Sequence, residues 1–158
     1  SVSFYSRCSM PRARWASAVP VVASHSCVRT LCDHPRNLDD EQLDALKESG
    51  GVIQITAMPA FLKPRDGDAP RSAGVSDFVD HIDYVVRRIG AEHVGISSDF
   101  DGGGALADWQ NATQGVNVTA ELLRRGYNAG EIAAFWGGNF MRLLARAEAV
   151  AEQRGTIG

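Results

Sequence analysis

Two short apolar runs of this sequence lead into polar side chains that could take part in catalysis. Residues 20–24 are rich in β-branched side chains and lead into His25, and residues 93–98 lead into Asp99. A neutral imidazole can bind a metal ion, and a carboxylate beside it can carry protons. The simpler alternative is that His25 and Asp99 only cap, by hydrogen bonding, the loops that follow them.

A third candidate is Arg36, which lies eleven residues after His25 and just before a predicted helix. Its guanidinium group could hold a carboxylate through two parallel hydrogen bonds, a geometry that lysine does not offer. The alternative is an ordinary solvated arginine that neighbours Asp39 and Asp40.

The remaining histidines and the cysteines complete neither a metal site nor a nucleophilic one. His34 and His93 fall at loop and strand-entry positions, and His81 lies beside the apolar side of a predicted helix, which favours a packing role. The three cysteines have no paired spacing, which argues against a disulfide scaffold and for a reducing compartment. A set of metal ligands around His25 cannot be completed from the residues present.

The apolar periodicity predicts the elements that would position these groups. Asp39 and Gln42 form a capping box for a helix that ends at the glycines 50–51, and a buried strand follows at residues 52–56. The proline-rich residues 58–74 predict a loop, and Ser76 is expected to cap an amphipathic helix that Gly90 ends. Further helices are expected at residues 119–125, at 128–135, where Asn128 is the cap and Glu131 follows three residues later, and at 139–154.

Strands that alternate with helices are typical of parallel βαβ units. Three strands cannot close a barrel, and a three-stranded parallel sheet with open edges is a poor domain by itself. The predicted fold class is therefore α/β: the carboxyl-terminal part of a (β/α)8 TIM barrel, with three parallel strands and with intervening and carboxyl-terminal helices. In such barrels the active site lies at the carboxyl ends of the strands, where both His25 and Asp99 fall.

The chain divides into three parts on this interpretation. Residues 19–154 form the barrel part, and residues 155–158 form a short polar tail. Residues 1–18 show neither helical nor strand periodicity, and we expect them to be an atypical or mis-joined segment.

The composition excludes several broad classes of protein. The 158 residues are 44% hydrophobic and 22% charged, which is typical of a globular protein and not of a disordered one. The net charge of −3 suggests no basic face for nucleic acid, and no apolar run reaches the length of a membrane span. With no secretory signal recognised, we expect a cytoplasmic protein.

Several blocks of the sequence match a known pattern together. They occupy residues 20–26, 34–40, 50–53, 80–84, 94–102, 122–127 and 137–142, and include Asp-Phe-Asp-Gly at 99–102 and Gly-Gly-Asn-Phe at 137–140. In their order and approximate spacing, these blocks resemble those of the membrane dipeptidase (renal dipeptidase) family of zinc metallopeptidases, over roughly residues 19 to 145.

The resemblance implies a (β/α)8 barrel that hydrolyses dipeptides with two zinc ions, bridged by a glutamate and a hydroxide. It also implies the site residues by matching motifs. His25 matches a ligand of one zinc ion, Arg36 matches the arginine that holds the terminal carboxylate of the substrate, and Asp99 matches the acidic residue that handles the proton on the tetrahedral intermediate and the leaving amine.

The sequence departs from the family pattern at the other metal ligands. The family's His-x-Asp pair, its bridging glutamate and a further zinc histidine have no counterparts, and Phe4 stands near the place of that histidine. We therefore expect these 158 residues to be inactive by themselves. The alternatives are a non-catalytic truncated paralogue that acts as an interaction or half-barrel module, pairing its strand edges with a second copy or an amino-terminal half-barrel, and another type of metal-dependent amidohydrolase.

Overall fold

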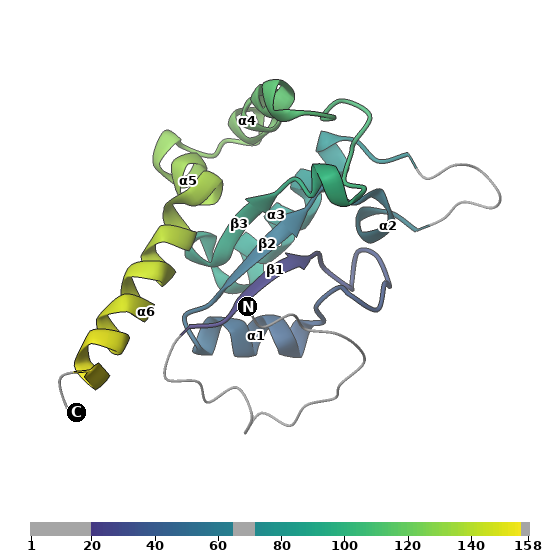
Figure 1. Cartoon of the computed structure of the whole chain (residues 1–158). Helices are drawn as coiled ribbons and strands as arrows, with labels where there is room; N and C mark the ends of the chain where they lie inside the picture. The colour runs from purple at the N-terminus through teal and green to yellow at the C-terminus, as the bar shows by residue number, and fades with distance from the viewer. Residues whose placement is uncertain (1–19, 65–71, 156–158) are drawn as a thin grey trace.

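The computed structural model describes residues 20–64 and 72–155, and these form a parallel three-stranded sheet in the order β1-β2-β3 with helices after each strand (Figure 1). The strands are β1 (Val22–Ser26), β2 (Val52–Thr56) and β3 (Val94–Ser97). The α-helices are α1 (Asp40–Glu48), α2 (Pro59–Leu62), α3 (Val75–Ile89), α4 (Gly115–Arg124), α5 (Ala129–Ala133) and α6 (Asn139–Gly155). The predicted α/β class with three parallel strands is confirmed. Residues 1–18, which we expected to be atypical, lie outside the described part.

The two faces of the sheet differ in character. Ala23, Ile53 and Val94 are paired in register, so they share one face, and all three belong to the main apolar core with residues of α1 and α3. Gln54 and Gly95 are likewise paired and share the opposite face, where a Cβ atom at Gly95 would lie 3.0 Å from Gln54 Cγ. The helix-covered face thus holds the core, and the other face carries smaller and more polar groups.

The start of α1 follows the predicted capping box. The Asp39 carboxylate accepts a hydrogen bond from the backbone N–H of Gln42, and the Gln42 side chain accepts one from the backbone N–H of Asp39. Both reciprocal bonds satisfy amide groups that the first helical turn would otherwise leave unpaired. Gly50 has a φ of 69° just after the helix, which explains why glycine stands there.

The start of α3 corrects the prediction that Ser76 caps this helix. Gly74 is the capping residue, and its backbone N–H donates to the Asp77 carboxylate, while Ser76 lies inside the first turn. The amide of Val75 donates to the Asp108 side chain at 2.8 Å. Because a distant carboxylate satisfies this amide, the helix begins earlier than local sequence signals indicate. The predicted helix end at Gly90 is confirmed.

Three other boundaries differ from the prediction. The expected loop after β2 contains the short helix α2, and α4 begins at Gly115 instead of residue 119. The helix expected over residues 128–135 starts as predicted with an Asn128–Glu131 capping box, but it passes after Ala133 into the π-helical segment Ala134–Gly138. Within this segment Gly137 has a φ of 173° and a ψ of −24°, which marks a kink between α5 and α6.

The long helix α6 is tied to the amino-terminal side of the sheet. Asn139 donates hydrogen bonds to the carbonyl oxygens of Ala91 and Val94, and Arg142 donates to the carbonyl oxygen of Glu92.

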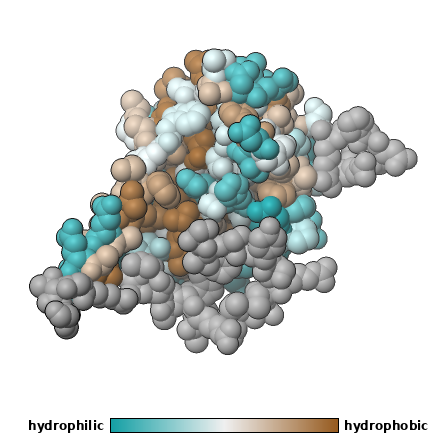
Figure 2. Space-filling model, in the orientation of Figure 1, coloured by the Kyte–Doolittle hydropathy of each residue, from teal (hydrophilic) through white to brown (hydrophobic). Residues whose placement is uncertain are grey.

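Hydrophobic surface gathers beside the start of α6 (Figure 2). The π-helical segment and α6 expose the large apolar side chains Trp136, Phe140, Met141 and Leu144. Across residues 20–64 and 72–155, no helix has the length and apolar character needed to cross a membrane.

Candidate functional site

His25 lies inside β1, which extends to Ser26 and corrects the prediction that the strand ends at residue 24. The register pairs Ala23 with Ile53 and Ser26 with Ile55, so β1 uses one residue more than β2 between these pairs. Such a bulge redirects a side chain locally. The His25 ring is 43% exposed, and its Nδ1 atom lies 2.9 Å from the Ser24 hydroxyl oxygen. This contact orients the ring and leaves Nε2 turned toward a second group.

That second group is Asp99, which follows β3. The Asp99 Oδ1 atom lies 3.9 Å from His25 Nε2, so side chains from the two outer strands of the sheet meet at the carboxyl ends. Asp99 has a φ of 53°, and it is the only non-glycine residue of the described part with a positive φ. A left-handed conformation costs about 1 kcal/mol or more for a residue other than glycine, and such costs gather at functional sites.

The turn after Asp99 holds this conformation. The carbonyl oxygen of Asp99 accepts hydrogen bonds from the amides of Gly102 and Gly104 at 3.0 and 2.7 Å. A Cβ atom at Gly104 would collide with the carbonyl oxygen of Ser98, and one at Gly102 would collide with the Asp99 carboxylate. The glycine-rich turn therefore lets the backbone close around Asp99.

Arg36 stands in the loop between β1 and α1. Its guanidinium carbon lies 5.2 Å from the ring centroid of Phe61 in α2, and its backbone N–H donates to His34 Nδ1. The loops that follow β1 and β2 both leave the sheet at the carboxyl ends of the strands, where the arrowheads point in Figure 1. We call His25, Asp99 and Arg36 the rim residues. The structure brings His25 and Asp99 together, and it seats Arg36 on an aromatic ring of the neighbouring loop.

The donor set available for a metal ion is small. In the part of the chain that the structure describes, no three histidine, cysteine, aspartate or glutamate side chains are grouped so that they could hold a metal. His25 and Asp99 provide one imidazole and one carboxylate. Cys27 is no candidate, because burial raises the pKa of its thiol and its sulfur donates to the carbonyl oxygen of Thr56. These residues do not by themselves make a zinc site.

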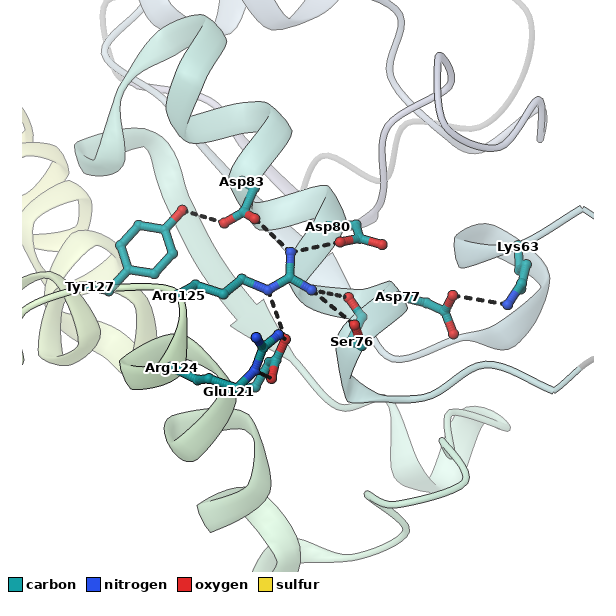
Figure 3. A network of polar contacts seen from close by, with 9 residues as sticks. All are labelled: Lys63, Ser76, Asp77, Asp80, Asp83, Glu121, Arg124, Arg125 and Tyr127. Atoms are coloured by element: carbon teal, nitrogen blue, oxygen red, sulfur yellow. Dashed lines mark hydrogen bonds and ion pairs between the residues drawn. The ribbon is translucent and has the colours of Figure 1, made fainter.

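A second polar cluster lies on the helical layer, centred on Arg125 (Figure 3). Its guanidinium group donates to the carboxylates of Asp80 and Asp83 at 2.6 Å and to Glu121 at 2.8 Å, and also to the backbone and side chain of Ser76. We call these five residues the Arg125 cluster. Because all three guanidinium nitrogens are engaged, the cluster joins α3 to the end of α4 and has no donor left on Arg125 for a ligand.

Two buried polar side chains, Asn37 and His81, lie near the rim. Asn37 is 1% exposed, and its amide group contacts three backbone groups of the surrounding loops. His81 is also 1% exposed, and both ring nitrogens contact backbone atoms, which confirms its predicted packing role. The only signal for Asn37 was its place beside Arg36, and no periodicity marks a buried loop residue.

The parallel strands and their covering helices form part of an α/β barrel, and the rim residues lie at the carboxyl ends of the strands. The chain belongs to the membrane dipeptidase family (peptidase family M19), because the family model matches residues 1–157. The expected family and the partial TIM barrel are thereby confirmed.

Two fungal dipeptidases are similar to this chain in sequence. Dipeptidase aclJ of Aspergillus oryzae is 38% identical over 133 residues, covering 84% of this chain and 31% of its own length. Dipeptidase tcpJ of Claviceps purpurea is 36% identical over 158 residues, covering 99% of this chain and 36% of its own. The chain therefore spans about a third of the length of these relatives.

Solved structures of this family share the fold. The probable dipeptidase PvdM of Pseudomonas aeruginosa superposes with a TM-score of 0.76 at 35% identity, over 80% of this chain and 44% of its own. A metallopeptidase of Rhodobacter sphaeroides, solved with a phosphinate mimic of the dipeptide L-Ala-D-Ala, has a TM-score of 0.76 at 31% identity, over 82% of this chain and 37% of its own.

Proposed function

We propose that the rim residues of this chain form part of the active site of a zinc-dependent dipeptidase. The observation that carries the proposal is the approach of His25 Nε2 to Asp99 Oδ1, at 3.9 Å, across the carboxyl ends of β1 and β3. Membership of a dipeptidase family supports the reaction class. The substrate class is a dipeptide, in line with the names of the relatives and with the dipeptide mimic bound to the Rhodobacter enzyme.

In this proposal Asp99 transfers protons. A carboxylate that acts as a general acid and base must lie within reach of the reacting atoms and be held in one orientation. The two amide hydrogen bonds to the Asp99 carbonyl fix the backbone, and the edge-to-face contact of Phe100 with Trp109, with ring centroids 5.5 Å apart, anchors the next residue. The Asp99 side chain is 21% exposed, so a substrate can approach it.

Arg36 is proposed to bind the terminal carboxylate of the dipeptide. A guanidinium group offers paired donors that match the two oxygens of a carboxylate. Arg36 is exposed, and its position over Phe61 restricts the side chain without withdrawing it from solvent. The rim would then bind the substrate at its carboxyl end and exchange protons with it at Asp99.

His25 is proposed as a ligand of one zinc ion, with the Ser24 hydroxyl group orienting its ring. Zinc would polarise the peptide carbonyl and activate water. Since the described residues do not make a complete zinc site, the other ligands would come from a part of the protein that pairs with the open edges of β1 or β3. This chain alone is then expected to be inactive.

The first test concerns the chain by itself. The purified chain, supplied with zinc and Gly-D-Ala, should show no turnover above the buffer. Turnover at the rate of a complete dipeptidase would contradict the proposal that other ligands are required.

The second test supplies the remaining ligands. In a chimera, residues 20–155 of this chain replace the matching part of the Rhodobacter sphaeroides metallopeptidase, whose fold agrees with a TM-score of 0.76. The chimera should hydrolyse Gly-D-Ala in a zinc-dependent manner, and Arg36→Ala should raise KM far more than it lowers kcat. A folded chimera whose KM does not respond to Arg36→Ala would contradict the role of Arg36.

A further inference from the structure

Asn37 connects three backbone groups beneath the rim. Its Oδ1 atom accepts a hydrogen bond from the amide of Cys27 at 3.0 Å, and its Nδ2 group donates to the carbonyl oxygens of Cys32 and Phe61 at 2.9 and 2.7 Å. One N–H partner and two C=O partners fix the orientation of the amide, because the reverse orientation would oppose like groups. The side chain is therefore fully specified by its surroundings.

His81 makes a parallel connection from α3. Its Nδ1 atom accepts a hydrogen bond from the amide of Val28 at 3.0 Å, and its Nε2 atom lies 3.0 Å from the carbonyl oxygen of Leu62. An acceptor at Nδ1 and a donor at Nε2 define a neutral imidazole with its proton on Nε2. Burial lowers the pKa of His81, which agrees with this neutral form.

The two side chains act on consecutive backbone groups. They accept from the amides of residues 27 and 28, directly after β1, and donate to the carbonyls of residues 61 and 62, at the end of α2. We call this arrangement the double bridge. It links the loop that carries Arg36 to the helix that carries Phe61, so both bridging side chains influence the distance between the guanidinium group and the Phe61 ring.

We propose that Asn37 and His81 are positioning residues for Arg36, and so for recognition of the substrate carboxylate. The inference rests on the proposed role of Arg36 and adds two residues to it that do not touch the substrate. Asn37 directly follows Arg36 in the sequence, and Phe61 supplies both a carbonyl acceptor for Asn37 and the ring beneath Arg36. The ring of His34, 4.4 Å from the Phe61 ring centroid, packs against the same ring.

The double bridge is a demanding arrangement because every member is buried. Removing one partner leaves a buried backbone N–H or C=O without a hydrogen bond, which is costly, so the loops would move to regain partners. Movement of α2 or of the loop after β1 would change the position of the Arg36 guanidinium group over the Phe61 ring. We expect the affinity for a carboxylate to fall about tenfold, because a paired charged contact tolerates little misplacement.

The test follows carboxylate binding by NMR in the full chain labelled with ¹⁵N. The Nε–H signal of Arg36 is recorded while Gly-D-Ala is added, and then while the carboxyl-terminal amide of Gly-D-Ala is added. The unmodified chain should show a saturable shift with the dipeptide and none with the amide. Asn37→Asp keeps an oxygen that accepts from the Cys27 amide but loses the donor to the carbonyl oxygens of Cys32 and Phe61. His81→Leu removes both contacts of the ring.

The matched control is His93→Leu. His93 is also a buried histidine, with Nδ1 2.7 Å from the carbonyl oxygen of Gly51, but it lies at the amino-terminal end of the sheet. Asn37→Asp and His81→Leu should each weaken dipeptide binding at Arg36 about tenfold, whereas His93→Leu should leave it unchanged. His81→Leu should also speed hydrogen exchange at the amide of Val28, which loses its acceptor.

The possible outcomes separate the two proposals. Binding that is equally tight in the bridge variants and the unmodified chain would overturn the inference and leave the role of Arg36 intact. Equal weakening in His93→Leu, or a collapse of signal dispersion across all three variants, would show a general effect on stability and would also overturn it. An unmodified chain whose Arg36 signal ignores the dipeptide would overturn the proposed role of Arg36, and the inference with it.

Discussion

The pair His25 and Asp99 and the Arg125 cluster are both polar and charged, but they differ in how closely their side chains approach their partners. Arg125 uses all its nitrogens in contacts of 2.6 to 3.0 Å and is 15% exposed. His25 and Asp99 approach only to 3.9 Å, and the His25 ring is 43% exposed. The cluster is a closed structural joint, whereas His25 and Asp99 leave hydrogen-bonding capacity for another molecule.

The backbone conformations of the two regions differ as well. The residues of the Arg125 cluster lie on or next to regular helices, and none of them has a positive φ. Asp99 lies in a left-handed conformation in a turn of glycines. In the proposed function, the site therefore lies where the charged contacts are few and long and the backbone is strained, and not where they are many and short.

The largest expected effect separates the two regions by activity. In the chimera described above, Asp99→Asn should lower kcat by about 10²–10⁴-fold, since the variant loses a proton-transferring carboxylate. Asparagine tolerates the left-handed conformation, so the free energy of unfolding should change by less than about 0.5 kcal/mol. Steady-state kinetics and urea unfolding on the same sample measure both effects. An Asp99→Asn chimera as active as its parent would contradict the catalytic role of Asp99 and with it the difference between the rim and the Arg125 cluster.

The converse change is Arg125→Met, which leaves three carboxylates close together without their shared cation. We expect the free energy of unfolding to fall by about 3 kcal/mol, read from urea unfolding of this chain. Arg124→Met is the matched control, because Arg124 contacts Glu121 alone and its side chain is 68% exposed. A loss in Arg125→Met no greater than that in Arg124→Met would show that the cluster is not a structural joint.

A third change tests the backbone around Asp99. Gly104→Ala places a methyl group against the carbonyl oxygen of Ser98 and 2.7 Å from that of Asp99. Neither backbone atom can move freely, so the free energy of unfolding should fall by about 2 kcal/mol. Gly74→Ala, whose Cβ would meet its nearest atom at 3.4 Å, should have a much smaller effect by the same urea assay. Equal effects of the two substitutions would contradict the tight turn.

The smallest expected effect is on the pH dependence of stability, which should differ between His81 beneath the rim and the Arg125 cluster. Burial lowers the pKa of His81, so the unfolded chain binds its proton first as the pH falls below the ordinary value of 6.5. Stability should therefore decrease between pH 6.5 and 5, by about 1 kcal/mol, and His81→Leu should remove that slope. Urea unfolding at pH 7, 6 and 5 gives the slope, and an identical slope in His81→Leu would refute this assignment.

The Arg125 cluster should respond only in stronger acid. Hydrogen bonds from the guanidinium group of Arg124 and, to a smaller extent, from that of Arg125 lower the pKa of Glu121 from 4.5 to about 2. The stabilisation by ionised Glu121 is complete above pH 4.5 and is lost as the pH falls toward 2. Between pH 6.5 and 5, Arg125→Met should thus show the same slope as the unmodified chain.

Local patterns in the sequence were sufficient for much of the fold. The Asp39–Gln42 and Asn128–Glu131 capping boxes and the helix end at Gly90 were all read correctly, because each depends on residues within one turn. The start of α3 was missed because Val75 is satisfied by Asp108, far along the chain. The extension of β1 was missed because a bulge depends on pairing with β2.

The candidate site shows the same division. The types and order of the residues were enough to nominate His25 and Asp99, and the structure brings them within 3.9 Å of each other. Nothing in the sequence indicated that Asp99 adopts a positive φ, or that Asn37 is buried between two loops. Both facts arise from contacts between segments that lie far apart in the chain, which single-sequence patterns do not report.

The most direct test of the central claim is the zinc content of the chimera with and without His25. Metal analysis after dialysis, together with hydrolysis of Gly-D-Ala, should show that His25→Ala loses both bound zinc and turnover. Arg124→Met should retain both. A His25→Ala chimera that keeps the zinc content and the rate of its parent would contradict the assignment of the rim as part of a zinc dipeptidase site.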